Sequence, residues 1–189
     1  MLDPNRIALL EALQAQYRYH KIKRFYPDSG PLRRELYPKH MLAFEFSKTY
    51  RETTFQGGNG VGKTEGVGAY VVTLHATGDY PGWWGGRTYS RPTDIWVAGD
   101  TKETVRDITQ VKLLGDIAKG GMDALGTGMI PRHALLTKDG QFNGKFRQGT
   151  NYACDFVRVK HVSGGYSTIG FKSYDQRRES FQGTEKDLI

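Results

Sequence analysis

The chain has 189 residues, of which 38% are hydrophobic and 25% charged, a composition typical of one globular domain with its own core. Its formal net charge of +7 favours an anionic partner such as nucleic acid or a nucleotide. The single cysteine, Cys154, excludes an internal disulfide and a CxxC metal site, and no apolar stretch approaches the roughly 18 residues of a membrane-spanning helix. We therefore expect a cytoplasmic protein without a membrane partner.

Residues 1–52 form a region that is predicted to be helical and basic. Asp3 followed by Pro4 is a favourable helix start. Apolar side chains then recur at three- and four-residue spacing, which predicts one stripe along the helix, at Ile7, Leu10, Leu13 and Tyr17. Residues 25–38 are rich in proline and glycine and indicate an irregular connector, and a second, short helix is expected from His40.

Positive charge is concentrated in this first region. Between residues 18 and 51 there are nine cations and three acids, a local excess of six. The cations are Arg18, Lys21, Lys23, Arg24, Arg33, Arg34, Lys39, Lys48 and Arg51. The pattern fits either a surface that faces nucleic acid or a simple solvated basic face.

From residue 53 onward, strand-like and helix-like segments alternate, which predicts an α/β fold. We expect a short strand over 53–56, a buried helix over 65–77, a turn-rich loop over 78–87 and a buried strand over 94–100. A helix should follow from Thr101 to about Leu114, because Asp100 and Glu103 have capping-box spacing. Two strand-like runs, 152–162 and 166–176, flank a Ser-Gly-Gly turn and predict a hairpin.

The sequence GGNGVGKT at residues 57–64, which we call the glycine loop, matches the pattern GxxxxGK[ST]. Glycine permits the backbone to surround phosphates with its N–H groups, so the motif predicts a nucleoside triphosphate site rather than a flexible turn. Lys63 is expected to reach the β- and γ-phosphates, and the Thr64 hydroxyl to bind Mg²⁺. The predicted binding residues are Gly57, Gly58, Asn59, Gly60, Val61, Gly62, Lys63 and Thr64.

Several longer stretches resemble the ATPase part of the large terminase subunit of tailed bacteriophages, the motor that pumps DNA into a procapsid. They are FQGGNGVGKT, TGDYPGWWGGRTYSRPTDIWVAGDTKETVRDITQVKLLG, GTGMIP, VKHVSGGYSTIGFKSYDQRRESFQGT and KDLI. Together they cover most of residues 53–189. The loop with two adjacent tryptophans and the ESFQGT run are far more particular than a phosphate-binding motif alone.

The resemblance implies a P-loop NTPase core of the ASCE, RecA-like type, with a largely parallel sheet plus a β-hairpin. It implies ATP and Mg²⁺ as ligands. The implied partners are double-stranded DNA, a terminase small subunit, a portal protein with its procapsid, and further copies of the chain in a ring. The protein would be encoded by a phage or prophage and act in the host cytoplasm. Residues 1–52 would lead into the adenine side of the site, and 53–189 would form a partial ATPase core.

Individual roles follow from the same resemblance. Lys63 would be the catalytic residue, and Tyr37 would stack on the adenine base or else pack its ring on the core. His40 stands where the family pattern tends to have Gln. A transition-state arginine is also implied, with three candidates that the sequence does not separate: Arg106, Arg177 and Arg178.

The chain departs from the family pattern at its end. The family's Asp-Glu pair would follow the apolar residues Leu188 and Ile189, so the sequence indicates an incomplete ATPase without the nuclease domain, weak or inactive in hydrolysis by itself. Two other interpretations stay open. One is a RecA-like helicase or another nucleic-acid-dependent ATPase, and the other is a non-catalytic remnant that only binds nucleotide.

Overall fold

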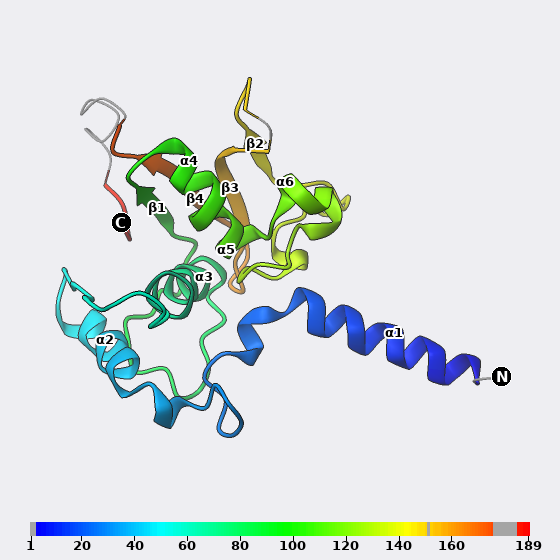
Figure 1. The fold of residues 1–189 in the computed structure, drawn as a ribbon, viewed down its shortest axis with the longest axis horizontal. Coiled ribbons are helices and arrows are strands. Elements are labelled where there is room, and N and C mark those ends of the chain that lie inside the picture. Colours follow the sequence, from blue (N-terminus) through cyan, green and yellow to red (C-terminus); the bar gives the residue numbers. More distant parts are fainter. Residues whose placement is uncertain (1–2, 151, 176–184) are drawn as a thin grey trace.

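A computed structural model describes residues 3–150, 152–175 and 185–189, which form a mixed α/β fold (Figure 1). The longer helices are α1 (Pro4–Tyr19), α2 (Pro38–Thr49) and α3 (Tyr70–Thr77). The shorter helical elements are η1 (Lys21–Arg24), η2 (Arg34–Leu36), η3 (Lys63–Ala69), α4 (Lys102–Thr104), η4 (Val105–Gln110), α5 (Val111–Leu114), α6 (Ile117–Gly120), η5 (Gly121–Ala124) and η6 (Arg132–Ala134). The strands are β1 (Asp94–Gly99), β2 (Gly144–Phe146), β3 (Cys154–Lys160) and β4 (Tyr166–Ser173).

The four strands form one sheet in the order β1-β4-β3-β2. β1 and β4 run parallel, whereas β4–β3 and β3–β2 are antiparallel pairs. The predicted hairpin over the two late runs is therefore confirmed. The expectation of a largely parallel sheet is wrong for the described strands, because the β3–β4 hairpin reverses direction once and the pairing of β2 with β3 reverses it again.

The last residues of the chain lie on the other side of β1. Leu188 forms a parallel bridge with Ile95, and the Trp96 amide donates to the Leu188 carbonyl at 2.9 Å. The Asp187 carboxylate accepts from the Asp94 amide at 2.9 Å and pairs with Arg91 at 2.6 Å. β1 is thus flanked by parallel neighbours on both edges.

The core lies where the sheet meets the helices. Side chains of β4 alternate between fully and half-buried positions, with Ser167, Ile169 and Phe171 on the buried side. α3 contacts β1, β3 and β4, and η4 contacts β1 and β4. As predicted, the segment after the glycine loop is helical and buried: every residue of α3 except Val71 is buried.

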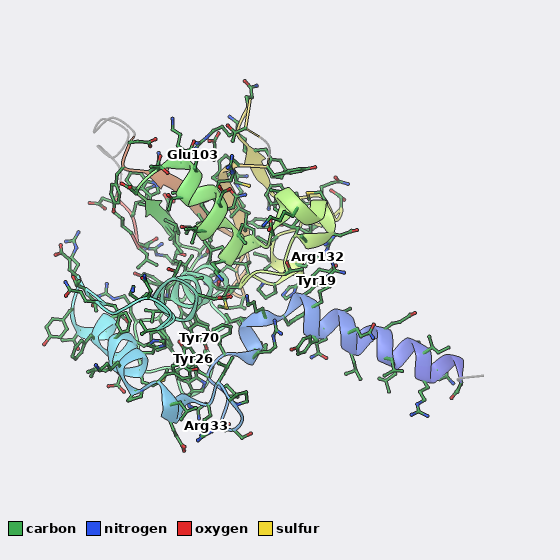
Figure 2. The ribbon with its side chains drawn as sticks, in the orientation of Figure 1. Tyr19, Tyr26, Arg33, Tyr70, Glu103 and Arg132 are labelled. Carbon is green, nitrogen blue, oxygen red and sulfur yellow. The ribbon has the colours of Figure 1, made fainter. Side chains whose placement is uncertain are left out.

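α1 is the predicted first helix, but its apolar stripe is uncovered. The Asp3 side chain caps it by accepting from the Asn5 amide at 3.1 Å. Ile7, Leu10 and Leu13 are all exposed, and the helix projects away from the rest of the chain (Figure 1). Among the described residues its anchor is at the C-terminal end of the helix, where the Arg132 guanidinium lies 5.1 Å from the Tyr19 ring centroid (Figure 2).

Two local expectations are wrong. Residues 53–56 form no strand, since no described segment pairs with them and an extended segment without a hydrogen-bonded neighbour gains no ladder. The helix after β1 is capped by Thr101, whose hydroxyl accepts from the Thr104 amide at 3.1 Å, and not by Asp100. The strand depends on a pairing partner and the cap differs by one residue, and sequence spacing alone resolves neither.

His75 is a buried titratable group within α3. Its Nδ1 lies 2.9 Å from the Tyr80 hydroxyl, which in turn accepts from the Tyr89 amide at 3.0 Å. The Tyr80 proton is therefore free to be donated to a neutral imidazole. Burial, and to a smaller extent the charge of Arg87, lowers the pKa of His75 to about 4.

Acid is expected to destabilise the fold through His75. Because its folded pKa lies below the ordinary value, the unfolded chain binds the proton first; the stabilisation is complete above about pH 6.5 and is lost as pH falls towards 4. The loss should be on the order of 2 kcal/mol at pH 5. Urea unfolding at pH 7 and pH 5 measures it, and His75→Gln should flatten the difference. An unchanged difference in that variant would contradict the assignment.

Candidate functional site

The glycine loop forms a tight turn that opens a helical segment. Gly60 and Gly62 have φ of +82° and +81°, a left-handed backbone conformation that residues other than glycine rarely adopt. The Gly62 carbonyl accepts from the Gly66 amide at 2.7 Å and from the Val67 amide at 3.1 Å, which begins the π-helical turn of η3. π-helical turns within helices are frequent at functional sites. The loop therefore passes directly into the buried α3.

The two side chains predicted to act on phosphate and metal both belong to this turn. The Lys63 ammonium group lies over the loop and donates to the carbonyls of Gly57 and Gly58, at 2.5 and 2.6 Å. Thr64 is exposed at the first turn of η3. An anion placed over the loop would contact the Lys63 ammonium group. A metal ion bound to that anion could take the Thr64 hydroxyl as a ligand. These residues can hold phosphate and Mg²⁺ in chemical terms.

Tyr26 and His40 connect the N-terminal region to the loop. His40, in the first turn of α2, has its Nε2 2.9 Å from the Val61 carbonyl and its Nδ1 2.7 Å from the Tyr26 hydroxyl. The Tyr26 hydroxyl donates to the Gly66 carbonyl at 2.7 Å. Both side chains are buried, at 2% and 5% exposure. Burial lowers the pKa of His40, although its hydrogen bond to Val61 opposes this, and burial raises the pKa of Tyr26.

Glu65 makes a second connection. Its carboxylate pairs with Lys21 from η1 and with Lys112 from α5, the latter at 2.8 Å. Burial alone would raise the pKa of Glu65, but the hydrogen bonds from Lys112 and Lys21 outweigh it and lower the pKa. The start of η3 is thus joined to segments on both sides in the sequence.

The other predicted site residues lie in different surroundings. Tyr37 is half-buried at the start of α2, with its ring centroid 5.2 Å from that of His40 and 5.7 Å from that of Tyr26. Arg106 forms a two-bond contact with Asp107, at 2.6 and 2.9 Å. Arg177 and Arg178 lie outside the described residues.

Part of the basic region is neutralised within the chain. Lys21 pairs with Glu65, Lys23 with Asp79, Arg33 with Glu35 and Arg34 with Asp28. No ion pair is formed within residues 3–150, 152–175 and 185–189 by Lys39, Lys48 or Arg51. Four of the nine cations that suggested a nucleic-acid surface are therefore paired within the described chain.

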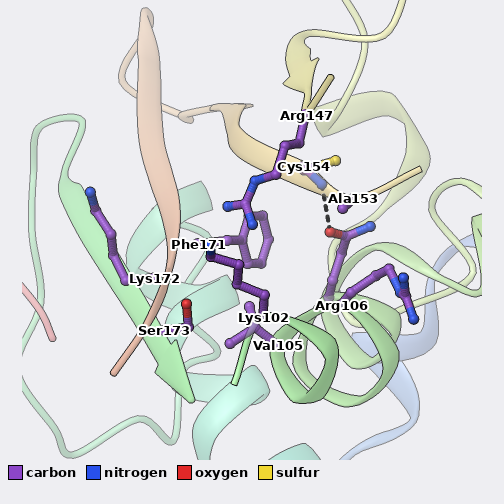
Figure 3. Close-up of a pocket in the computed structure, with 10 residues that line it drawn as sticks. Lys102, Val105, Arg106, Arg147, Ala153, Cys154, Phe171, Lys172 and Ser173 are labelled. Carbon is purple, nitrogen blue, oxygen red and sulfur yellow. Dashed lines mark hydrogen bonds between the residues drawn. The ribbon is translucent and has the colours of Figure 1, made fainter. Parts of the chain in front are cut away.

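A separate small pocket lies between the carboxyl end of β4, the start of β3 and the α4–η4 segment (Figure 3). Its volume is about 10 Å³, room for about one water molecule, and Lys102, Arg106, Arg147 and Lys172 are among the residues that line it. Cys154 is another lining residue; burial raises the pKa of its thiol to about 12, so the thiol stays protonated. This fits a small core residue rather than a nucleophile.

Sequence reasoning missed the contacts of Tyr26 and His40 with the loop. The family resemblance places His40 on the adenine side of the site, and Tyr26 has no distinguishing spacing. The one usable signal was His40 in place of Gln, since both side chains can donate one hydrogen bond through a nitrogen at similar reach. The partner of that bond was not visible in the sequence.

The fold and the loop together define a mixed α/β protein in which a glycine-rich turn opens a buried helix. The chain is homologous to the terminase large subunit of Salmonella phage P22, with 31% identity over 199 residues. The match includes 96% of this chain and 37% of that protein, so the chain spans well under half the length of its relative. No family model matches the chain, and no solved structure matches it. No helix in the described parts of the chain is long and apolar enough to cross a membrane.

Proposed function

We propose that the chain is the ATP-binding part of a phage terminase large subunit, the motor that drives viral DNA into a procapsid. The observation that carries the proposal is the glycine loop, which turns on two left-handed glycines directly into a buried helix with Lys63 lying over it. The homology to a terminase large subunit supports the motor as the setting of this loop.

In this proposal the backbone amides of the loop surround the phosphates of ATP. Lys63 contacts the β- and γ-phosphates and supplies the positive charge on which phosphoryl transfer depends, and the Thr64 hydroxyl binds Mg²⁺. Tyr37 is the candidate for stacking on the base. Hydrolysis also needs carboxylates that hold the metal and position water. As the resemblance implies, we expect this chain to bind ATP better than it turns it over.

The whole motor would require further components. Double-stranded DNA, a terminase small subunit and a portal protein in a procapsid are the proposed partners, with several copies of the chain in a ring in the host cytoplasm. Arg106, Arg177 or Arg178 would supply the arginine for the transition state. The Asp107 carboxylate that now contacts Arg106 would have to release it for that role.

Isothermal titration of this chain with Mg-ATP, ADP and AMP tests the proposal. Because the loop binds the β- and γ-phosphates, ATP should bind at least about tenfold more tightly than AMP, the equivalent of one charge-assisted contact. Equal affinity for ATP and AMP would contradict a phosphate-binding loop. A parallel phosphate-release assay separates binding from turnover, and rapid turnover would contradict the expectation that this chain mainly binds.

A further inference from the structure

Tyr26 and His40 contact the backbone of the glycine loop and of the turn that follows it, on the side that faces α2. His40 contacts the Val61 carbonyl and Tyr26 contacts the Gly66 carbonyl, so the pair grips the backbone both before and after Lys63. These contacts come from a region that lies more than twenty residues earlier in the chain. They are made to backbone atoms only, and therefore act on the loop's conformation rather than on one side chain.

The contact with Val61 determines how one peptide group of the loop is oriented. A carbonyl can only accept, so His40 must carry its proton on Nε2 and donate to the Val61 oxygen. In a planar trans peptide the C=O and the following N–H point in opposite directions. Holding the Val61 carbonyl towards His40 therefore turns the Gly62 N–H away from α2, to the side on which an anion over the loop would lie.

The Tyr26 hydroxyl completes the arrangement. With the His40 proton on Nε2, Nδ1 is an acceptor, so the single Tyr26 proton is shared between Nδ1 and the Gly66 carbonyl, each of which lies 2.7 Å from the hydroxyl oxygen. Tyr26 has a φ of +56°, a backbone conformation that is strained for a tyrosine. Strain of this kind persists only where surrounding contacts determine it, and it concentrates at functional sites.

Two glycines in the loop region make this close approach possible. A Cβ at Gly62 would lie 3.2 Å from His40 Cε1, and a Cβ at Gly66 would lie 2.8 Å from the Tyr26 hydroxyl. A side chain at Gly66 would therefore displace the tyrosine. Gly66 is outside the phosphate-binding motif, and the contact with Tyr26 explains why this position has a glycine.

We propose that Tyr26 and His40 are positioning residues that hold the glycine loop in the conformation that binds phosphate. The expected effect on ATP affinity rests on the proposed function. The two contacts themselves, which we call the clamp, are present in the chain without nucleotide. Neither side chain is required to touch the nucleotide.

Three substitutions in the full chain test it: Tyr26→Phe, His40→Leu and His40→Gln. The first two each remove a hydrogen bond to the loop, and should weaken ATP binding about fivefold to tenfold while changing AMP binding little. His40→Gln keeps a donor for the Val61 carbonyl and should restore most of the ATP affinity. Tyr70→Phe is the matched control, because Tyr70 packs at 4.9 Å from the Tyr26 ring but its hydroxyl makes no hydrogen bond to the loop among the described residues (Figure 2).

Amide hydrogen exchange of residues 57–66 without nucleotide gives an independent readout. Tyr26→Phe and His40→Leu should speed exchange there about fivefold or more, with no such change in Tyr70→Phe. Unchanged exchange in both variants would overturn the clamp whatever the affinities are.

Faster exchange with unchanged ATP affinity, or equal losses for ATP and AMP, would overturn the positioning role. A wild-type chain that does not bind ATP would instead overturn the proposed function, and exchange alone would then decide on the clamp. If His40→Leu does not fold, Tyr26→Phe carries the decision, with Tyr70→Phe as its control.

Discussion

Lys63→Ala is expected to reduce the affinity of the chain for ATP by about tenfold to one hundredfold, the effect of one lost hydrogen-bonded contact with a charged group. The structure gives the physical reason, because the Lys63 ammonium already lies over the loop within 2.6 Å of two of its carbonyls. A bound triphosphate would offer that charge better acceptors than neutral carbonyls. In a full-length motor the same substitution should abolish Mg-ATPase activity, since the lysine stabilises charge on the transferred phosphoryl group.

A charge-matched variant makes this result specific. Lys39 is exposed on α2 and forms no ion pair in the described residues, so Lys39→Ala removes one positive charge without changing the loop. Isothermal titration of both variants with Mg-ATP compares them directly. Equal affinities for Lys63→Ala and the wild type would remove the glycine loop from the proposed site, and equal losses in both variants would indicate a general charge effect.

Gly115→Ala is expected to be among the most destabilising single substitutions in this chain. Gly115 follows α5 with φ of +103° and ψ of +165°, a region of backbone conformation that is essentially restricted to glycine. A Cβ there would lie 2.1 Å from the Ala124 carbonyl oxygen and 2.4 Å from the Thr127 hydroxyl. Overlap with a backbone oxygen cannot be relieved by a side-chain rotation. We expect a loss of about 4 kcal/mol or more in the free energy of unfolding.

Gly164→Ala separates strain from overlap. Gly164 has a similar φ of +95°, in the turn between β3 and β4, but no atom lies within 4 Å of its would-be Cβ. Its loss should be limited to backbone strain, about 1–2 kcal/mol. Urea unfolding of the two variants beside the wild type measures both. Similar losses would mean that the contact between Gly115 and Ala124 is not tight in solution.

Local patterns predicted most of the helices and strands of this chain because each is encoded within a few residues. Asp3 and Pro4 begin α1, the β3–β4 hairpin follows from two strand-like runs around Ser-Gly-Gly, and the apolar composition of 65–77 matches the buried α3. Expectations that depended on distant partners were the ones that differed. Residues 53–56 have no neighbouring strand, and the stripe on α1 has no covering surface in the described chain.

The candidate site shows the same division. The glycine loop, Lys63 and Thr64 were predictable because the motif is contiguous, with its chemistry written into eight residues. Its assignment to ATP remains a prediction. His40, Tyr26 and Lys112 contact residues of this segment that lie 21, 40 and 47 positions away in the chain, and no spacing indicates such contacts.

By itself, the sequence predicted an α/β fold, a glycine-rich turn before a buried helix, and a resemblance to a phage terminase large subunit. Only the tertiary structure decided that the sheet is mixed, that several cations of the basic region are paired internally, and that His40 faces the loop backbone. The physical reason is the range of the interactions. Backbone conformation and helix capping are set by adjacent residues, whereas strand pairing, ion pairing and the orientation of a buried histidine depend on which distant groups the folded chain brings within about 3 Å.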